Sequence, residues 1–232
     1  MKLQGGKVRQ AAAIARVLRR VNRPCYLEPF VGAGSVLAQV ASSFQTVIAA
    51  DNHEDLIVMH RALQSGWEPP SAVTEWEWRT ARHAPPSAYR AYVGYQCSWG
   101  GRWFQGYARE GCRGDLDFAA QGVAQTLKNA AAAKGTTYVW ADYRAFRPNS
   151  DWAVYCDPPY YGTTTLRGKP FDISPFWATM DAWVCAGALV YVSERSAPAG
   201  WSPVLTQAKT LALGLDNDKP VQADILFTRT QT

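Results

Sequence analysis

The feature of this sequence that most constrains its fold is a succession of strand, glycine turn, helix, strand and acid near the amino-terminal end. Cys25–Phe30 predicts a short strand, and the glycine turn Val31–Ser35 follows it, with Ser35 placed to cap a helix to about residue 43. Thr46–Ala50 predicts a second strand, which ends on Asp51. This order is typical of half of a doubly wound α/β sheet, in which ligands bind beyond the carboxyl ends of the strands.

The rest of the sequence predicts more of the same sheet after a long interruption. Helical periodicity is found over 6–21, 53–65, 117–134 and near 174–186. Further strands are predicted over 137–141, 152–156, 188–193, 204–213 and 221–228, the last two joined by a turn. Residues 67–115 are rich in Trp, Tyr, Arg, Gly and Pro and show no strand alternation. We therefore expect a catalytic domain formed by residues 1–55 and 136–232, interrupted by a mostly helical region over 56–135.

Composition argues against a membrane protein and against a metal site. The 232 residues are 47% hydrophobic and 19% charged, and no apolar run approaches the roughly 18 residues that a spanning helix needs. No hydrophobic signal segment follows the start at Met1, so an intracellular protein is expected. The five cysteines are scattered without a C-x-x-C pair, and the three histidines do not complete a zinc site, so no metal is expected.

The charge distribution favours a polyanionic partner only weakly. The formal net charge is +5, and the segment before Glu28 carries basic residues without an acid: Lys2, Lys7, Arg9, Arg16, Arg19, Arg20 and Arg23. Such a segment can attract nucleic acid. It can equally be the solvated face of a helix, and the sequence leaves both interpretations open.

Asp157-Pro158-Pro159-Tyr160 is the stretch with the clearest chemical meaning. It follows an apolar strand, so its carboxylate is expected at the edge of the sheet where ligands bind. Two prolines lack N–H donors and leave carbonyls as acceptors. Asp157 and the Pro158 carbonyl can accept the protons of an amino group while the Tyr160 ring stacks on a planar base. A helix cap at Asp157 and a core aromatic at Tyr160 are the structural alternatives.

Gly32 and Gly34 with Asp51 predict a nucleotide site. Glycines allow the backbone to approach a ligand at the start of a helix, and an acid after the next strand can bind ribose hydroxyls. The pair alone also fits a nicotinamide-dependent dehydrogenase. Leu37 stands where the third glycine of the dinucleotide fingerprint would be, which weakens that alternative.

Taken together, these motifs resemble the DNA adenine methylases of the Dam type, and among them the small members carried by phages and prophages. The segments that carry the resemblance are Gly5-Gly6-Lys7, Glu28–Ser35, Asp51-Asn52, Leu63–Trp67, Cys97–Arg109, Asp142-Tyr143-Arg144, Asp157–Tyr160 and Val192–Glu194. The resemblance implies a Rossmann-like S-adenosylmethionine-dependent methyltransferase sheet with a mostly helical inserted DNA-recognition region.

The resemblance also implies the roles of the site residues. The cofactor-binding residues would be Leu3, Lys7, Phe30, Gly32, Gly34, Asp51, Asp142 and Asp157. Lys7 would lie near the methionine end, Asp51 would bind the ribose, and Asp142 would receive the adenine amine of the cofactor. Asp157, Pro158 and Tyr160 would form the catalytic pocket for the target base. Leu3 stands where the family usually has an aromatic residue.

The inserted region predicts a DNA contact. Ser98–Arg109 interleaves arginines, aromatics and glycines, a combination that suits phosphates, base edges and close approach to a duplex. Arg102, Trp103 and Arg109 are the predicted DNA-binding residues. The aromatic side chains of this stretch can instead form a small core of the insertion.

The predicted function is transfer of a methyl group from S-adenosylmethionine to the N6 amine of an adenine flipped out of duplex DNA, at a specific site. Double-stranded DNA is the expected partner, with no membrane, and the protein is expected as a monomer or weak dimer in the cytoplasm of a bacterial or phage-infected cell, near the nucleoid. Cytosine in DNA, adenine in RNA and glutamine in a protein are alternative acceptors. A catalytically silent DNA-binding module and a dehydrogenase are alternatives from other classes.

Overall fold

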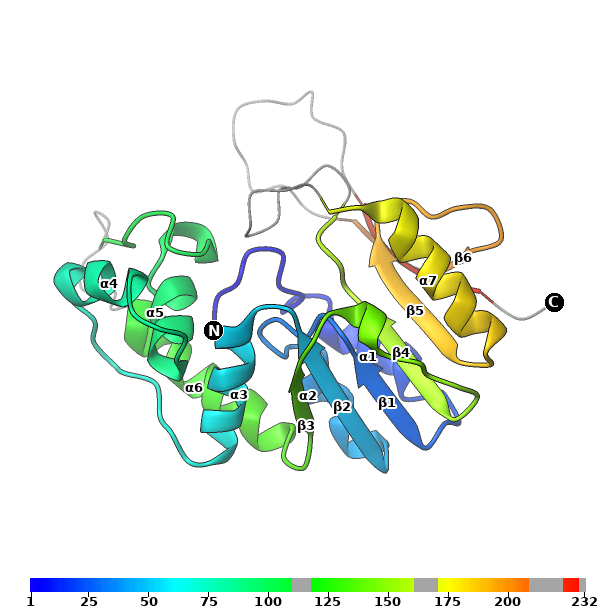
Figure 1. Cartoon of the computed structure of the whole chain (residues 1–232), viewed down its shortest axis with the longest axis horizontal. Coiled ribbons are helices and arrows are strands. Elements are labelled where there is room, and N and C mark those ends of the chain that lie inside the picture. The colour runs from blue at the N-terminus through cyan, green and yellow to red at the C-terminus, as the bar shows by residue number, and fades with distance from the viewer. Residues whose placement is uncertain (110–117, 161–170, 209–222, 230–232) are drawn as a thin grey trace, which may run out of the picture.

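The computed structural model describes residues 1–109, 118–160, 171–208 and 223–229, and the described strands form one sheet of seven (Figure 1). The strands are β1 (Cys25–Glu28), β2 (Thr46–Asp51), β3 (Thr137–Trp140), β4 (Trp152–Cys156), β5 (Leu189–Glu194), β6 (Ser202–Ala208) and β7 (Ala223–Thr228). Their order in the sheet is β3-β2-β1-β4-β5-β7-β6. β1 to β5 pair in parallel, and β7 runs antiparallel to both β5 and β6. This confirms the predicted Rossmann-like α/β sheet.

The strand order reverses between β1 and β4, which are neighbours in the sheet although β2 and β3 separate them in the chain. In an open α/β sheet a crevice forms beyond the carboxyl ends of the strands at such a reversal. Both motifs predicted to bind ligands lie there, because Pro29 follows β1 and Asp157 follows β4.

The described helices lie on the two faces of the sheet and beside its β3 edge (Figure 1). They are α1 (Ala11–Leu18), α2 (Leu37–Val40), α3 (Glu54–Gln64), α4 (Glu75–Arg82), α5 (Ala88–Gln96), α6 (Phe118–Ala132) and α7 (Ile173–Cys185). Short 3-10 turns occupy Ala41–Ser43, Trp99–Gly101 and Tyr143–Ala145. None of the helices in the described ranges combines the length and apolarity needed to cross a bilayer.

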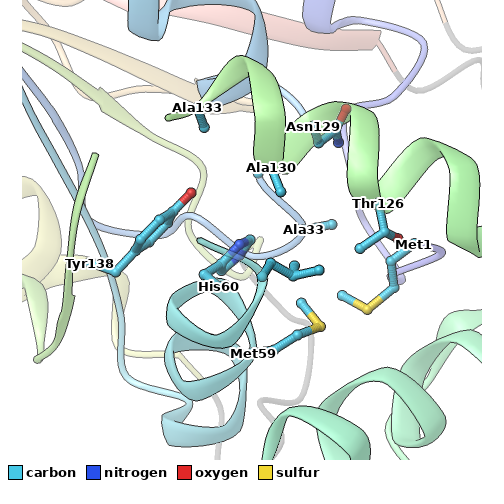
Figure 2. Close-up of a pocket in the computed structure, with 11 residues that line it drawn as sticks. Met1, Ala33, Met59, His60, Thr126, Asn129, Ala130, Ala133 and Tyr138 are labelled. Carbon is cyan, nitrogen blue, oxygen red and sulfur yellow. The ribbon is translucent and has the colours of Figure 1, made fainter. Parts of the chain in front are cut away.

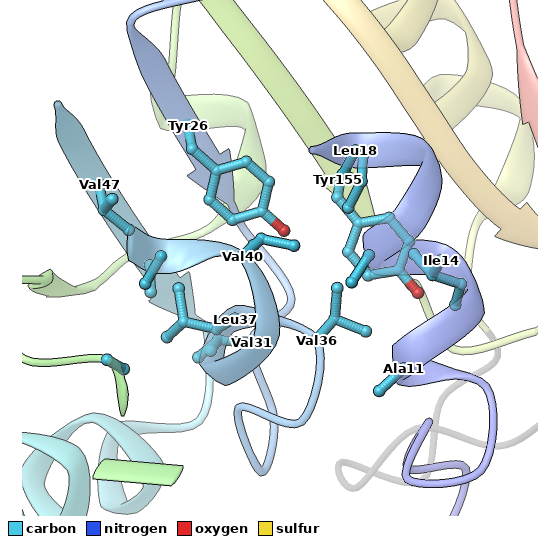
Figure 3. Packing of buried hydrophobic residues seen from close by; sticks show 14 of the residues in the cluster. Ala11, Ile14, Leu18, Tyr26, Val31, Val36, Leu37, Val40, Val47 and Tyr155 are labelled. Carbon is cyan, nitrogen blue, oxygen red and sulfur yellow. The ribbon is translucent and has the colours of Figure 1, made fainter. Parts of the chain in front are cut away.

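One face of the sheet is packed by α1 and α2. Tyr26 of β1 and Tyr155 of β4 point into this layer and meet Ile14, Leu18 and Leu37 (Figure 3). Burial of apolar side chains stabilises by about 25 cal/mol per Å² of surface removed from water. The middle strands are buried on both faces, which explains why their sequences read as continuous apolar runs.

The other face is covered by α7, and its core is rich in large aromatic rings. Phe176, Trp177 and Trp183 of this helix pack against Val154 of β4 and Val190 of β5. The aromatic packing continues toward the carboxyl ends of the strands, because the Phe176 ring also contacts Phe30 and Tyr143. The aromatic core on this face therefore extends to the carboxyl ends of the strands, where ligands are expected to bind.

The helices α4, α5 and α6 lie beyond the β3 edge of the sheet, where α5 and α6 pack with α3 and α4 packs on α5 (Figure 1). Thr74 begins α4 with a capping box, in which its hydroxyl accepts from the Glu77 backbone and the Glu77 carboxylate accepts in return; Ser87 caps α5. The mostly helical character predicted for this region agrees with these elements. The boundaries 1–55, 56–135 and 136–232 stay a prediction.

Several element ends differ from the prediction. Ser35 does not cap the following helix: α2 begins after Val36, with no side-chain cap, because the glycine turn extends one residue further. The first helix begins at Ala11 rather than near residue 6, since Gly5 takes a φ of 81° and the preceding segment forms a turn. The predicted turn between the last two strands, residues 214–220, lies outside the described residues.

Candidate active site

An open cleft of about 1160 Å³ extends along the carboxyl ends of β1, β2, β3 and β4. Most of the predicted site residues line it, from segments far apart in the chain: Leu3, Lys7, Phe30, Gly32, Asp51, Asp142, Asp157, Pro158 and Tyr160. Arg102 and Trp103 of the helical region close its other side. The fold thus brings together residues that the sequence holds far apart.

Asp157 and Lys7 form a buried ion pair at the centre of the cleft. The Lys7 Nζ lies 2.6 Å from Asp157 Oδ1 and 2.7 Å from the Tyr160 hydroxyl, and the lysine side chain is only 5% exposed. Asp157 keeps 18% of its side chain accessible, so its carboxylate still faces the cleft. A buried charge is tolerated when it is paired and hydrogen-bonded. Lys7 therefore leaves Asp157 an ionised acceptor that a ligand can reach.

Two cations lie close to the Tyr160 ring. The Lys7 Nζ lies 4.6 Å from the centre of its ring, and the Arg195 guanidinium lies 5.5 Å from it. Burial, together with the nearby carboxylate of Asp157, raises the pKa of the Tyr160 phenol well above its usual range, so it stays protonated. A neutral phenol ring at this place is suited to stacking, and it is not a core aromatic because it lines the cleft.

The glycine turn is held by hydrogen bonds at both the N–H and the carbonyl of Gly32, which we call the Gly32 clamp. The Gly32 N–H donates to Asp51 Oδ2 at 3.0 Å, and the Gly32 carbonyl lies 2.8 Å from His60 Nε2. Gly32 has a φ of 49° and Gly34 a φ of 68°, in the left-handed region that favours glycine. The clamp therefore fixes a turn that side chains would strain.

His60 supports this turn from behind. Its ring stacks in parallel on Tyr138, with centroids 4.7 Å apart, beside a small pocket that Gly34 also lines (Figure 2). Burial lowers the pKa of His60 to about 4, so the imidazole is neutral at pH 7 and can donate to the Gly32 carbonyl. Gly34 faces His60 rather than the cleft: a Cβ built there would lie 3.3 Å from His60 Cε1. No sequence motif indicated a role for His60.

Asp51 has the acceptor capacity expected of a ribose-binding acid. Its two oxygens accept from the backbone of Gly32 and, at 2.9 Å, of His53. An ionised carboxylate has about four acceptor positions, so further hydroxyls can be bound. Burial raises the pKa of Asp51 to about 6, against the lowering effect of these backbone hydrogen bonds.

Asp142 and Phe30 lie at the β3 and β1 sides of the cleft. Asp142 pairs with the Arg144 guanidinium through both oxygens, at 2.7 and 2.9 Å, and 37% of its side chain is exposed. The Phe30 ring packs against Tyr143 at 5.3 Å and continues the aromatic layer under α7. Asp142 can thus accept a further donor at the rim, while Phe30 forms part of the floor.

Glu28 lines the cleft at the end of β1, and its side chain is almost fully buried. Its carboxyl is 2.7 Å from the Tyr26 hydroxyl, and only 2% of the residue is exposed. Burial raises the pKa of Glu28 to about 8, against the lowering effect of the Tyr26 hydrogen bond, and the Asp157 charge raises it further. Glu28 is therefore mostly protonated at pH 7, and the motif that contains it gave no indication of this state.

The three predicted DNA-binding residues lie in different environments. Arg102 is exposed at the cleft, and Arg109 is exposed with its guanidinium 3.0 Å from Glu75. The Trp103 ring instead packs against His53 at 4.4 Å and Tyr95 at 4.9 Å. For Trp103 this contact favours the alternative of a small core. The DNA contacts of all three residues stay predictions.

Residues 4–80 match the model of the D12 class N6 adenine-specific DNA methyltransferase family. The predicted family resemblance is confirmed over this segment. It contains Lys7, Phe30, Gly32, Gly34 and Asp51, and it supports methyl transfer as the activity. The Asp157 motif and the aromatic stretch of the insertion lie beyond the match. No curated protein matches the chain in sequence.

Three solved structures illustrate the similarity in fold. A tRNA methyltransferase of Aquifex aeolicus is 13% identical, with 96% of this chain and 68% of that chain covered and a TM-score of 0.41. A SAM-dependent methyltransferase of Agrobacterium tumefaciens is 13% identical, with 96% of this chain and 60% of that chain covered and a TM-score of 0.42. An rRNA methylase of Streptococcus thermophilus is 8% identical, with 97% of this chain and 98% of that chain covered and a TM-score of 0.42. The fold assignment itself depends on the strand order above.

Within the described ranges, no group of three or more His, Cys, Asp or Glu side chains is arranged to hold a metal ion.

Proposed function

We propose that this chain is an S-adenosylmethionine-dependent DNA methyltransferase that modifies the N6 amine of an adenine flipped out of the duplex. The observation that carries the proposal is Asp157, an ion-paired but accessible carboxylate at the carboxyl end of β4 with Pro158 and Tyr160 beside it. The family match over residues 4–80 supports adenine as the acceptor and DNA as its context.

The cleft fits the cofactor. Asp51 retains acceptor positions for two ribose hydroxyls, and the clamped Gly32 allows close approach of the backbone. A Cβ built at Gly32 would lie 3.7 Å from a methyl of Leu3, so Leu3 lies over the turn and completes an apolar wall. Asp142 offers an acceptor at the rim for an amine. When bound, S-adenosylmethionine supplies an electrophilic methyl group on its sulfonium.

The residues of this chain act on the acceptor amine. The Asp157 carboxylate and the Pro158 carbonyl would accept hydrogen bonds from its two N–H groups, which orients the nitrogen lone pair out of the plane of the base. The nitrogen would release one of these protons to solvent once it carries the methyl group. Tyr160 would hold the base by stacking. Positioning of this kind, with preorganised acceptors, supplies most of the rate in a direct transfer. Pairing with Lys7 favours the ionised form of Asp157, because the Lys7 Nζ lies 2.6 Å away in a buried environment.

A DNA substrate is supported by the charged and aromatic surface around the cleft. Arg102 and Arg109 are exposed on the side formed by the helical region. Trp99 is 67% exposed in the same hairpin-like loop, where its backbone N–H donates to the Gly106 carbonyl at 2.9 Å. Arginines bind phosphates, and exposed aromatics can insert between bases. RNA adenine remains the alternative acceptor that a test has to separate.

The proposed function is tested by transfer of a tritiated methyl group from S-adenosylmethionine to duplex DNA, to single-stranded RNA and to protein. We expect incorporation into duplex DNA, recovered as N6-methyladenine. Asp157→Ala is expected to lose at least about 100-fold in rate, since it removes a preorganised acceptor. Asp151→Ala is the matched control, because Asp151 is exposed and directly precedes the same strand β4. Incorporation into RNA or protein alone, or an Asp157→Ala variant as active as the parent, would refute the proposal.

The expected monomer or weak dimer and the cytoplasmic location near the nucleoid stay predictions. So does a phage or prophage origin.

A further inference from the structure

A second buried carboxylate, Asp224, lies behind the proposed base pocket on β7. It is 7% exposed, and its Oδ2 accepts from Gln10 Nε2 at 3.0 Å. It is also hydrogen-bonded to the Tyr160 hydroxyl. A buried carboxylate is unfavourable unless its oxygens are bound, and Asp224 meets this condition by reaching two elements far from it in sequence.

The Tyr160 hydroxyl is consequently bound on two sides. It accepts from the Lys7 ammonium at 2.7 Å, and its own proton is available for Asp224. A phenol has one donor proton and can accept at the same time, so the two hydrogen bonds are compatible. Together they fix the hydroxyl and hence the direction of the ring.

One short segment supplies both supports. The Gln10 N–H donates to the Lys7 carbonyl at 3.0 Å in the turn that leads into α1. Lys7 reaches Asp157 and Tyr160, and Gln10 reaches Asp224. The base pocket is therefore tied to α1 on one side and to β7 on the other.

We propose that Asp224 is a positioning residue, which sets the plane of the Tyr160 ring through the tyrosine hydroxyl and thereby the orientation of the stacked base. This inference rests on the proposed function. The orientation matters because an in-line transfer requires the acceptor nitrogen to face the methyl group, and a misplacement of about 1 Å can lower a rate about 100-fold. Asp224 does not line the cleft, so it acts through Tyr160.

The test is a double-mutant cycle of Asp224→Asn and Tyr160→Phe. We expect Asp224→Asn to lower kcat on duplex DNA about 10-fold while the Kd for S-adenosylmethionine, measured by calorimetry, changes less than about 2-fold. In the Tyr160→Phe background, Asp224→Asn should lower kcat no further, since the hydroxyl through which it acts is gone. Asp181→Asn is the matched control: Asp181, on α7, also accepts from two side chains, Trp201 and Arg229, but lies outside the cleft, so kcat should be unchanged.

The parent, the two single variants and the double variant of the cycle are also compared in urea unfolding without any ligand. A hydrogen bond between the two side chains predicts that the shift of the urea midpoint in the double variant differs from the sum of the shifts in the two single variants. If the shifts of the urea midpoint in the two single variants add up to the shift in the double variant, the positioning role is refuted while the proposed function stands. The same holds if Asp224→Asn lowers kcat equally in both backgrounds. If the parent protein transfers no methyl group to DNA, the proposed function fails, and the role of Asp224 in base stacking fails with it, even where the unfolding data show the contact.

Discussion

Substitution of the buried Glu28 by Gln is expected to stabilise the protein at neutral pH and to leave it unchanged in acid. The pKa of Glu28 is raised from 4.5 to about 8, so the folded state binds its proton more tightly than the unfolded state. The stability that the protonated carboxyl contributes is therefore complete below about pH 4.5 and is lost as the pH rises to about 8. A glutamine side chain at this position would be neutral at every pH and would escape this loss.

The magnitude follows from the two pKa values. Each pH unit between them removes about 1.36 kcal/mol of unfolding free energy, so the loss from pH 4.5 to pH 7 is about 3 kcal/mol. Glu28→Gln keeps an oxygen that can accept from the Tyr26 hydroxyl, so the substitution does not orphan this buried donor. The variant should thus exceed the parent by about 3 kcal/mol at pH 7.

The measurement is urea unfolding, followed by tryptophan fluorescence, at a series of pH values from 4.5 to 8. The difference in unfolding free energy between variant and parent separates the effect of Glu28 from that of the other titrating groups, which both proteins share. Glu68→Gln is the control, because Glu68 is exposed; its effect should stay within about 0.5 kcal/mol at each pH. A difference for Glu28→Gln that does not change with pH, or a parent that is the more stable at pH 8, would refute the reasoning.

Three further outcomes are expected. His60→Phe removes the donor to the Gly32 carbonyl and should raise the calorimetric Kd for S-adenosylmethionine about 10-fold, with kcat at saturation nearly unchanged; an unchanged Kd would contradict the clamp. Gly94→Ala places a Cβ 2.5 Å from Trp103 and should lower the unfolding free energy by about 1–3 kcal/mol, whereas an unchanged urea midpoint would show that the ring can move. Arg109→Ala should weaken DNA binding for every sequence and reduce the salt slope, seen by fluorescence anisotropy, by about 1; an unaltered slope would exclude a phosphate contact.

The contiguous motifs were predictable because each depends on local order. A strand that ends on an acid places that acid at the carboxyl edge of a parallel sheet, whatever the rest of the chain does. Asp51, the last residue of β2, and Asp157, which follows β4, both lie there, as the sequence predicts. The family match over residues 4–80 covers the first of these motifs.

The contacts that join separate motifs were not predictable in the same way. Periodicity shows that a helix has an apolar face but not which charged side chain at its entrance will be buried. Lys7 precedes α1 in a basic segment that fits a solvated face equally well, yet it is buried against Asp157. Asp224 and His60 carry no motif, because their roles depend on partners in other elements: Tyr160 for one and Gly32 for the other.

Trp103 shows the limit of composition. Arginines, aromatics and glycines in one stretch are typical both of a DNA-binding loop and of a small folded unit. The absence of a side chain at Gly94 favours the small folded unit for this ring, because Trp103 occupies that space and packs edge-on against His53. Arg102 and Arg109 remain exposed, so the same stretch can supply packing and surface charge together.

The neighbouring carboxyls Glu28 and Asp157 differ in environment in a way that suits the proposed chemistry. Glu28 is buried, forms no ion pair with any residue in the described part of the chain and is mostly protonated at pH 7. Asp157 is paired with the Lys7 ammonium, an arrangement that favours the ionised form. Two nearby carboxyls pushed toward opposite protonation states are a common basis for distinct roles in one site. With Glu28 neutral, the negative charge is concentrated on Asp157, the carboxylate that faces the cleft. Glu28 ionises in the folded protein only as the pH approaches 8, after most of its stabilising effect has already been lost. This separation of charge is then lost as well, and the rate of methyl transfer to duplex DNA should fall in that pH range.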